Sequence, residues 1–541
     1  MWGQGAIDPA RACKWLLIPG NAGGLLTERT GIAGDPLESQ HHYNGNVRKS
    51  KNMEIKYMEN RNESGKKQKA KGLCPNFGKC GGCQYLDVPY EEQLKKKKKQ
   101  LTELLKPFCQ VRDVIGMEDP WHYRNKVHAV IARDRKGRII SGVYKEGTHF
   151  VLPVDTCLIE DQKADDIIRT IRELVPSFKM KVYDEDTGYG FLRHVLIRTG
   201  HSTGEIMVVL VTASPVFPSK NNFVKALRAA HPEITTVVQN INGRGTSMVL
   251  GEKEHVLYGP GFIVDELCGF RFRISSRSFY QINPVQTEKL YRLAIQAAGL
   301  TGKETVIDAY CGIGTIGIAA SPEAKEVIGV ELNPDAVRDA VTNAKVNGVK
   351  NIRFYCNDAG KFMIQMASQG GKADVVFMDP PRSGSTEEFI NAVATLKPAR
   401  VVYVSCGPDT LARDLTVFKR KGYEAKEAWG VDMFPFTGHV ETVVLLSKLN
   451  AKQHIEVELN LDELDLTDAE KKATYQEIKD YVLEHSGLKV SSLYIAQVKQ
   501  KCGIIERENY NKPKSENVKQ PQCPPEKEKA IKEALKHFGM V

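Results

Sequence analysis

The 541-residue sequence predicts an α/β fold built from more than one domain. A chain of this length exceeds what one hydrophobic core normally serves, so we expect separate domains and tails. Between residues 305 and 446, strand-like runs rich in Val and Ile alternate with helical stretches, as βαβ units do. We therefore expect a seven-stranded Rossmann-like domain at 271–450, an α+β domain before it at 71–270 and a helical extension after it at 451–541.

The chain ends and the bulk composition narrow the class of protein. Residues 1–70 lack periodicity and are rich in Gly, Asn, Lys and Arg, which predicts a disordered basic segment. The net charge of +10 favours an anionic partner, with nucleic acid as a candidate. No stretch approaches the roughly 20 apolar residues of a membrane-spanning helix, and the run "CKWLLIP" is shorter than a signal-peptide core. We expect a cytoplasmic protein without a membrane partner, in which the 12 cysteines are not disulfide-bonded.

The 71–270 region mixes short strands with helices. The stretch "YEEQLKKKKKQLTELL" predicts a helix at 90–105, and its Lys95–Lys99 run is more often a solvated face than a phosphate contact. A further helix is expected near 161–175. The clearest β-like runs are 125–132, 194–200, 205–213 and 235–242.

Seven strand-like runs predict the sheet of the 271–450 domain. The first five alternate with helices and should pair in parallel. The last two are separated by too little chain for a crossover helix, so they should form an antiparallel pair. The seven runs are 305–310, 326–332, 352–358, 373–379, 400–406, 423–431 and 440–446.

The first two strands carry the signs of a cofactor pocket. Gly312 and Gly314 follow the first strand directly, where a tight turn lets the backbone approach a ligand. Glu331 lies 23 residues after Asp308, about where an acid binds a ribose hydroxyl pair. This spacing suits dinucleotides and S-adenosylmethionine alike.

The third and fourth strands decide between these cofactors. Asp358 ends the third strand, at the position of an adenine-contacting acid in methyltransferases of this fold. The fourth strand ends in "MDPPRSG", whose consecutive prolines hold a rigid, extended turn. Asp379 would then be presented beside a methyl donor, and a dehydrogenase has no need of this feature. We therefore predict S-adenosylmethionine as the cofactor.

A thiol and a carboxylate follow at the next strand ends. Cys406 ends the fifth strand in "VVYVSCGPDT", and Glu441 lies where the last strand begins. Carbon 5 of uracil becomes nucleophilic once a thiolate has added to carbon 6, and a base must later remove the carbon 5 proton so that the thiol can leave. Cys406 is placed for the first role and Glu441 for the second. A histidine in the position of His439 is more often a packing residue or an RNA contact than the base.

Six motifs follow one another in order along the chain: "SFYQINPVQTEKLY", "DAYCGIGTIGIA", "ELNPDAV", "DPPRSG", "VSCGPDTLARDL" and "FPFTGHVETVVLL". This set resembles the RNA 5-methyluridine methyltransferases that act on 23S ribosomal RNA and transfer RNA, and the resemblance covers roughly residues 71–450. It implies Cys406 as the nucleophile and Glu441 as the proton acceptor. It also implies S-adenosylmethionine contacts from Gln281, Tyr310, Glu331 and Asp379, with Asp358 as a further candidate.

A cysteine-rich stretch, "CPNFGKCGGCQY", lies before the 90–105 helix. Cys74, Cys80 and Cys83 are separated by five and then two residues, and we take Cys157 as the fourth ligand. The spacing alone leaves a four-thiolate zinc site and an iron-sulfur cluster nearly even. The pattern resembles the iron-sulfur branch of the same family, which implies a 4Fe-4S cluster with a structural or RNA-positioning role and a 23S ribosomal RNA substrate.

The C-terminal extension predicts helices. A capping box, Thr467 to Glu470, opens two helices joined at Gly487, and a last helix begins with proline in its first turn. A small packing module is favoured over a nucleic-acid-binding helix-turn-helix.

The favoured function is methylation of carbon 5 of a uridine in 23S ribosomal RNA by a monomeric enzyme. Three alternatives stay open: a transfer RNA uridine, a cytosine target, and a non-catalytic RNA-binding or assembly factor. The presence of both Cys406 and Glu441 argues against the last, because a pure binder needs neither. A DNA-binding regulator, suggested by the extension, is weaker still.

Overall fold

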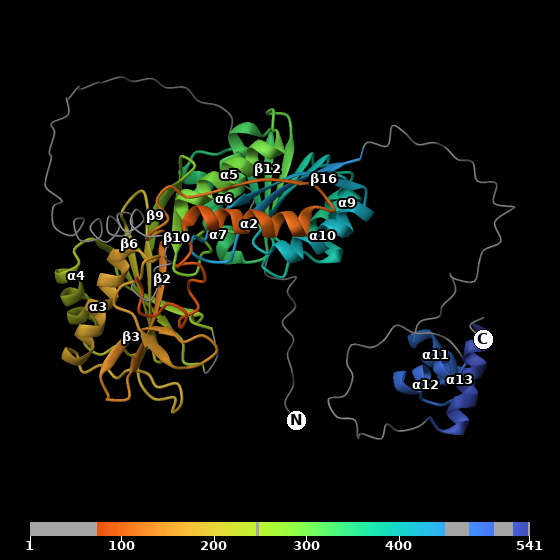
Figure 1. Cartoon of the computed structure of the whole chain (residues 1–541), viewed down its shortest axis with the longest axis horizontal. Helices are drawn as coiled ribbons and strands as arrows, with labels where there is room; N and C mark the ends of the chain where they lie inside the picture. Colours follow the sequence, from red (N-terminus) through yellow and green to blue (C-terminus); the bar gives the residue numbers. More distant parts are fainter. Residues whose placement is uncertain (1–72, 245–247, 450–474, 503–522, 539–541) are drawn as a thin grey trace, which may run out of the picture. The chain divides into compact units, whose positions relative to one another are not determined.

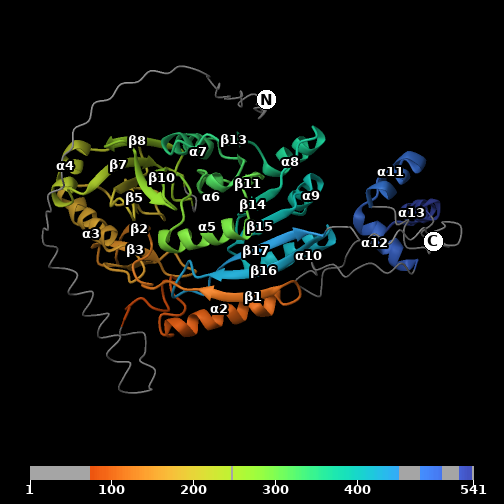
Figure 2. The same cartoon turned by 90° about the horizontal axis from the view of Figure 1, so that it is seen from above.

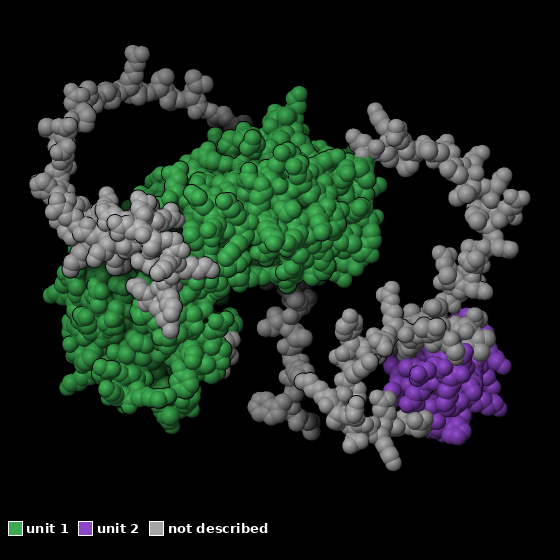
Figure 3. Space-filling view, in the orientation of Figure 1, with its two compact units in different colours: residues 1–450 green, residues 451–541 purple. Residues whose placement is uncertain are grey.

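The structure is a computed structural model that describes residues 73–244, 248–449, 475–502 and 523–538. It contains two compact units, Met1–Asn450 and Ala451–Val541 (Figure 3), which are described separately below. The predicted disordered segment 1–70 and the predicted capping box Thr467–Glu470 lie outside the described residues. The domain boundary near residue 270 stays a prediction.

The principal sheet of the first unit has eight strands within the described residues, in the order β1-β16-β17-β15-β14-β11-β12-β13. The parallel pairing of β11 to β15 and the antiparallel pairing of β16 with β17 are confirmed. The strand bounds are β1 Gln110–Ile115, β11 Thr305–Ala309, β12 Glu326–Glu331, β13 Ile352–Cys356, β14 Val375–Met378, β15 Arg400–Ser405, β16 Tyr423–Val431 and β17 Glu441–Lys448.

The seven predicted strands are all present, but the prediction of seven was wrong because it lacked β1. This strand pairs in parallel with β16, and α2 (Tyr90–Leu105) packs beside both (Figure 2). Leu101, Leu105, Val111 and Val114 of α2 and β1 join the core on this side of the sheet. The methyltransferase-type sheet therefore includes residues that the sequence assigned to the α+β domain.

The Lys95–Lys99 run is not wholly a solvated face. Lys97 is 1% exposed and forms an ion pair with Asp432. The helical spacing of four places Lys97 on the same buried stripe as Gln93, Leu101 and Leu105. The expectation therefore fails for the residue at the centre of the run.

Helices cover both faces of this sheet, as expected for a doubly wound fold (Figure 1). Alternate strand residues divide between two apolar clusters, for example Val306 and Ile307 of β11. The helices of one cluster are α5 Pro284–Ala298, α6 Thr315–Ala320 and α7 Pro334–Val346, with the short 3-10 helix η3 Ser321–Glu323 after α6. The helices of the other are α2, α8 Ala359–Ser368, α9 Glu387–Leu396 and α10 Pro408–Arg420.

A second sheet of the first unit has seven strands in the described residues, in the order β4-β3-β2-β5-β6-β7-β8. The helices α3 (Gln162–Ser177) and α4 (Lys220–Ala230) pack on one face, and β9 (Phe262–Leu267) and β10 (Phe270–Ser275) form a separate hairpin. The four predicted β-like runs and the predicted helix near 161–175 are all present. The strands are β2 Lys126–Arg133, β3 Ile139–Tyr144, β4 Val151–Pro153, β5 Leu192–Thr199, β6 Ile206–Thr212, β7 Ile234–Ile241 and β8 Lys253–Tyr258.

The second unit is a small helical module with its own core. Its helices are α11 (Tyr475–Ser486), α12 (Ser492–Lys501) and α13 (Pro525–His537), and Gly487 follows α11 with a φ of +68°. Ile478, Ile495 and Ile531 are fully buried among them. Among the helices of the described ranges, none is long and apolar enough to cross a membrane.

Candidate active site

The predicted site residues gather at one edge of the principal sheet. The strands β11, β12, β13, β14 and β15 run in parallel, so their carboxyl ends share that edge. The strand β17 runs the opposite way and begins there, with Ser405 paired with Thr442. Cys406, which follows β15, and Glu441, which begins β17, are therefore neighbours across adjacent strands.

The turn after β11 is shaped by left-handed backbone. Tyr310, Gly312 and Gly314 have φ values of +64°, +54° and +84°. A Cβ on Gly314 would lie 2.9 Å from the Phe354 ring, whereas one on Gly312 would meet nothing within 4 Å. Gly314 is thus required by packing, and Gly312 leaves open space in which a ligand can approach the backbone.

The carboxylate of Glu331 is oriented by this turn. The N–H of Gly312 donates to its Oε2 at 3.1 Å, and the N–H of Asn333 donates to its Oε1 at 2.8 Å. On the far side of the turn, the N–H of Gly317 donates to Asp308 at 2.8 Å. Asp308 therefore stabilises the turn, and Glu331 is the acid held at the open edge, where it can accept hydrogen bonds from ribose hydroxyls.

Asp358 and Gln281 have structural contacts of their own. Asp358 caps α8 by accepting a hydrogen bond from the N–H of Lys361 at 2.9 Å. The carbonyl of Gln281 accepts a hydrogen bond from the Asn125 side chain at 3.1 Å, which fixes the segment before α5. Asp358 lies two residues beyond the end of β13, and neither contact tests a role in binding a cofactor.

Cys406 is a half-buried thiol beside charged groups. Its pKa is raised to about 11, first by burial and then by Glu441 and Asp379, while the Arg382 guanidinium opposes the shift. Cys406 also immediately precedes Gly407, the N-cap of α10, where the helix dipole favours a thiolate. The site therefore holds a thiol in the resting protein, with two features that stabilise its ionised form.

Glu441 is a buried carboxyl, 4% exposed. Its pKa is raised to about 8, first by burial and then by Asp379, while Arg382 opposes the shift. The pKa of Asp379 is raised by burial to about 7. A carboxyl that titrates near neutral pH can both accept and release a proton under working conditions, which is what a general base requires.

Arg382 is the charged residue that the sequence reasoning missed. It follows the two prolines of "DPPRSG", and its charge acts on Cys406, Glu441 and His439. A cation directly after the rigid turn was the available signal. The His439 ring packs edge-on against Phe434, with a ring separation of 6.1 Å, and its pKa is lowered by burial first and then by Arg382.

The four predicted metal-ligating cysteines lie in one neighbourhood. Cys74, Cys83 and Cys157 pack against an apolar cluster that includes Phe436. The pKa of Cys83 is raised to about 12, first by burial and then by Cys80 and Cys74. Cys83 likewise acts on Cys157, whose pKa is raised chiefly by burial.

Within the described residues, the four thiols are not arranged as a metal site. Nowhere in the part of the chain that the structure describes do three or more His, Cys, Asp or Glu residues come together so that they could hold a metal ion. The donors are of the thiol type that zinc or an iron-sulfur cluster requires, but their arrangement does not converge. The predicted centre is therefore not confirmed, and no catalytic step depends on it.

The fold and the site define the class of protein, an S-adenosylmethionine-dependent methyltransferase. The family described as tRNA (Uracil-5-)-methyltransferase matches residues 89–449, and the chain belongs to this family. It is thus an RNA methyltransferase. It is 45% identical over 382 residues to an uncharacterized RNA methyltransferase of Halalkalibacterium halodurans, covering 70% of this chain and 83% of that protein.

Other relatives agree with this class. An uncharacterized RNA methyltransferase of Clostridium acetobutylicum is 42% identical over 385 residues, covering 70% of this chain and 84% of the relative. Among solved structures, the tRNA (uracil-54, C5)-methyltransferase of Pyrococcus abyssi in complex with S-adenosyl-L-homocysteine is similar, with a TM-score of 0.58 and 28% identity over 68% of this chain and 85% of that one.

Proposed function

We propose that the protein transfers a methyl group from S-adenosylmethionine to carbon 5 of a uridine in 23S ribosomal RNA, through a covalent bond between Cys406 and carbon 6. The observation that carries this proposal is the meeting of Cys406 and Glu441 at the ends of β15 and β17, beside Asp379 and Arg382. Gln281, Tyr310, Glu331 and Asp379 hold the cofactor in this proposal. When bound, the cofactor supplies an electrophilic methyl group.

The first step belongs to Cys406. Its thiolate adds to carbon 6, and the electron pair of the carbon 5–carbon 6 double bond moves onto the carbonyl at carbon 4 as an enolate. The thiol must first lose its proton, against a pKa of about 11. Arg382 and the N-terminus of α10 favour the thiolate that this step requires.

The last step belongs to Glu441. Carbon 5 of the enolate has by then taken the methyl group and still carries its hydrogen. The Glu441 carboxylate removes that proton, the electron pair re-forms the carbon 5–carbon 6 double bond, and the bond to Cys406 breaks to return the thiolate. A pKa of about 8 makes the Glu441 carboxylate a stronger base than an ordinary carboxylate, and the ionised fraction that performs this step grows as the pH rises towards 8.

A covalent trap tests this chemistry. RNA that contains 5-fluorouridine should form a stable adduct with the protein, because fluorine at carbon 5 cannot be removed as a proton. Cys406→Ala should form none while still binding S-adenosylmethionine. An adduct that persists in Cys406→Ala would show that another residue is the nucleophile.

The RNA target is a separate proposal. The cysteine pattern that resembles the iron-sulfur branch supports 23S ribosomal RNA, whereas the family description and the Pyrococcus abyssi structure name transfer RNA. Mass mapping of 5-methyluridine in ribosomal and transfer RNA, with and without the gene, separates the two. Loss of the methyl group from transfer RNA alone would overturn the ribosomal proposal.

We also propose that Cys74, Cys80, Cys83 and Cys157 hold a 4Fe-4S cluster with a structural or RNA-positioning role. The shared neighbourhood of the four thiols supports this reading. Anaerobically purified protein should be brown, and Cys83→Ser should lose the colour. A colourless, zinc-containing protein would contradict the cluster.

We also propose that the protein is a cytoplasmic monomer. Analytical ultracentrifugation tests the oligomeric state, and cell fractionation tests the location.

A further inference from the structure

The chain between β16 and β17 forms a nine-residue turn, Asp432 to Val440, that leads directly into Glu441; we call it the base turn. Phe436 in this turn has a φ of +66° and is 1% exposed. A bulky residue in left-handed backbone is strained, and such strain persists only where the surroundings enforce it. Contacts with neighbouring segments therefore hold Phe436 in this strained conformation.

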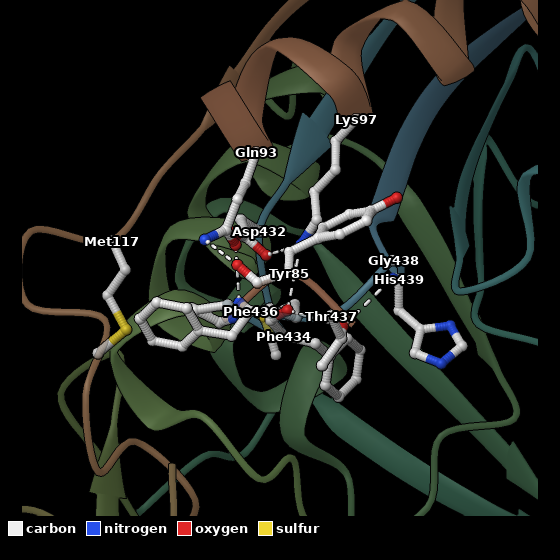
Figure 4. A network of polar contacts seen from close by, with 12 residues as sticks. Tyr85, Gln93, Lys97, Met117, Asp432, Phe434, Phe436, Thr437, Gly438 and His439 are labelled. Carbon is white, nitrogen blue, oxygen red and sulfur yellow. Dashed lines mark hydrogen bonds and ion pairs between the residues drawn. The ribbon is translucent and has the colours of Figure 1, made fainter. Parts of the chain in front are cut away.

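Phe436 is held on three sides (Figure 4). Its N–H donates to the side-chain oxygen of Gln93 at 2.9 Å. Its carbonyl accepts hydrogen bonds from the N–H groups of Gln84 and Tyr85 at 3.0 and 2.9 Å. Its ring stacks on Trp121 with the ring centres 4.3 Å apart. Segments far apart in the sequence thus converge on one residue of the base turn.

Gln93 is the centre of this arrangement. Its amide nitrogen donates to the carbonyls of Tyr85 and Val88 at 3.1 and 2.8 Å, while its oxygen accepts from Phe436. The side chain is fully buried. Because one amide serves these three backbone groups, removing it takes away one of the contacts that hold the base turn and leaves buried polar atoms without partners.

Lys97 holds the beginning of the same turn, one helical turn further along α2 (Figure 4). Its Nζ donates to Asp432 Oδ1 at 2.6 Å and to the Phe434 carbonyl at 3.1 Å. Both members of the Lys97–Asp432 pair are buried, so loss of one leaves the other charge uncompensated. Burial lowers the pKa of Lys97, and Asp432 opposes that shift.

The base turn is also tied to the segment that carries Gln281. The Asn283 side chain donates to the Met433 carbonyl at 3.1 Å, and the Gln286 side chain donates to the Asp432 carbonyl at 3.1 Å. Within the turn, Thr437 Oγ1 donates to the Phe434 carbonyl at 2.8 Å. Glu441 lies five residues after Phe436, and between them the N–H of His439 donates to Thr437 Oγ1 at 3.2 Å.

We propose that Gln93 and Lys97 are positioning residues for the proton-removal step, and that they act through the base turn to hold the Glu441 carboxylate against carbon 5 of the target base. The proposal rests on the proposed function. Gln93 and Lys97 touch neither the cofactor nor the RNA in this account. They set the place of the base, which matters because a misplacement of about 1 Å can cost on the order of 100-fold in rate.

The test separates proton removal from the earlier steps. Unmodified total RNA from a strain lacking the gene is incubated with S-adenosylmethionine and Gln93→Met, a substitution that roughly conserves volume. Methyl transfer should continue while proton removal slows, so a covalent protein–RNA complex carrying the new methyl group should accumulate on ordinary uridine and survive denaturing electrophoresis. We expect kcat to fall on the order of 100-fold and KM to fall with it, so that kcat/KM stays nearly unchanged, because the slowed step follows formation of the covalent complex.

A matched pair on α2 provides the control. Lys97→Met should accumulate the same complex, whereas Lys99→Met, which changes a lysine that is 79% exposed two residues away, should behave as wild type. Gln84→Ala offers a milder variant, because its exposed side chain accepts a hydrogen bond from the Gly438 N–H at 3.2 Å. It should accumulate less complex than Gln93→Met.

Two results would overturn the positioning role. One is wild-type kinetics in both Gln93→Met and Lys97→Met. The other is a general loss of function in all variants, including Gln84→Ala: no adduct on 5-fluorouridine RNA, no S-adenosylmethionine binding and reduced thermal stability. That pattern would show that these residues act in folding alone. A wild-type protein that produces no 5-methyluridine would instead overturn the proposed function itself.

Discussion

Glu441→Gln should stabilise the protein while removing its activity. The carboxyl has an ordinary pKa of 4.5 in the unfolded chain and about 8 in the folded protein, where burial is the main cause. Since the folded value is the higher one, the protonated carboxyl is favoured in the folded state. Glu441 therefore makes its full contribution to the free energy of unfolding below about pH 4.5, and this contribution is lost as the pH rises towards about 8.

The magnitude follows from the two pKa values. At pH 7 the carboxyl is ionised in the unfolded chain but protonated in the folded protein. Folding therefore takes up a proton about 2.5 pH units above the pKa of the unfolded carboxyl, which costs ~3 kcal/mol of stability. At pH 5 the same difference is below ~1 kcal/mol. Glutamine is neutral throughout, so the free energy of unfolding of Glu441→Gln should exceed that of wild type by up to ~3 kcal/mol at pH 7 and by much less at pH 5.

Urea denaturation at both pH values measures this difference, with the fluorescence of Trp121 and Trp429 reporting on the first unit. Glu424→Gln is the control, because Glu424 pairs with Lys426 on the surface of β16 and its pKa is lowered, not raised. The same Glu441→Gln protein should lose about 10²- to 10⁴-fold in turnover. Equal stability of Glu441→Gln and wild type at pH 7 would refute the assignment of Glu441 as a buried, proton-holding carboxyl.

Other predictions address the remaining parts of the site. Arg382→Met should raise the pKa of Cys406 and move the pH dependence of 5-fluorouridine adduct formation to higher pH; an unchanged profile would remove Arg382 from thiolate formation. Glu331→Ala should weaken S-adenosylmethionine binding by about 10- to 100-fold in calorimetry, with RNA affinity unchanged. Gly314→Ala should destabilise the protein more than Gly348→Ala in thermal denaturation, because both have positive φ but only Gly314 also meets a ring, at 2.9 Å; equal losses would contradict the packing argument.

The sequence predicted best what depends on local pattern. Runs such as 375–378 and 401–404 are buried on both faces and read as continuous apolar strands, which is how parallel sheets appear in sequence. The strand β1, "QVRDVI", has two buried positions out of six and pairs on one side only, so its pattern carried little signal. Its place in the sheet is decided by contacts with β16, more than 300 residues later in the chain.

The same limit applies within the site. Strand ends pointed to Cys406, Glu441, Glu331 and Asp379, because parallel strands bring their carboxyl ends to a common edge. The influence of Arg382 on the thiol and the carboxyl depends on how the turn after β14 folds back, which local pattern does not specify. Cysteine spacing likewise indicated a shared neighbourhood, whereas convergence on a metal depends on backbone details that spacing does not contain.

The electrostatics of the site explain why Glu441, among several acids, suits the role of base. Asp308, Asp379 and Glu441 all have raised pKa values of about 7 to 8, each with burial as the first cause. Asp308 is committed to the Gly317 N–H, and Asp379 follows β14 at the rigid Pro-Pro turn. Glu441 instead begins β17 next to the strand that ends in the thiol, at the end of a turn held by Gln93 and Lys97. Its carboxyl combines a pKa raised by burial with a place beside the proposed nucleophile, and the base turn that leads into it is held by α2.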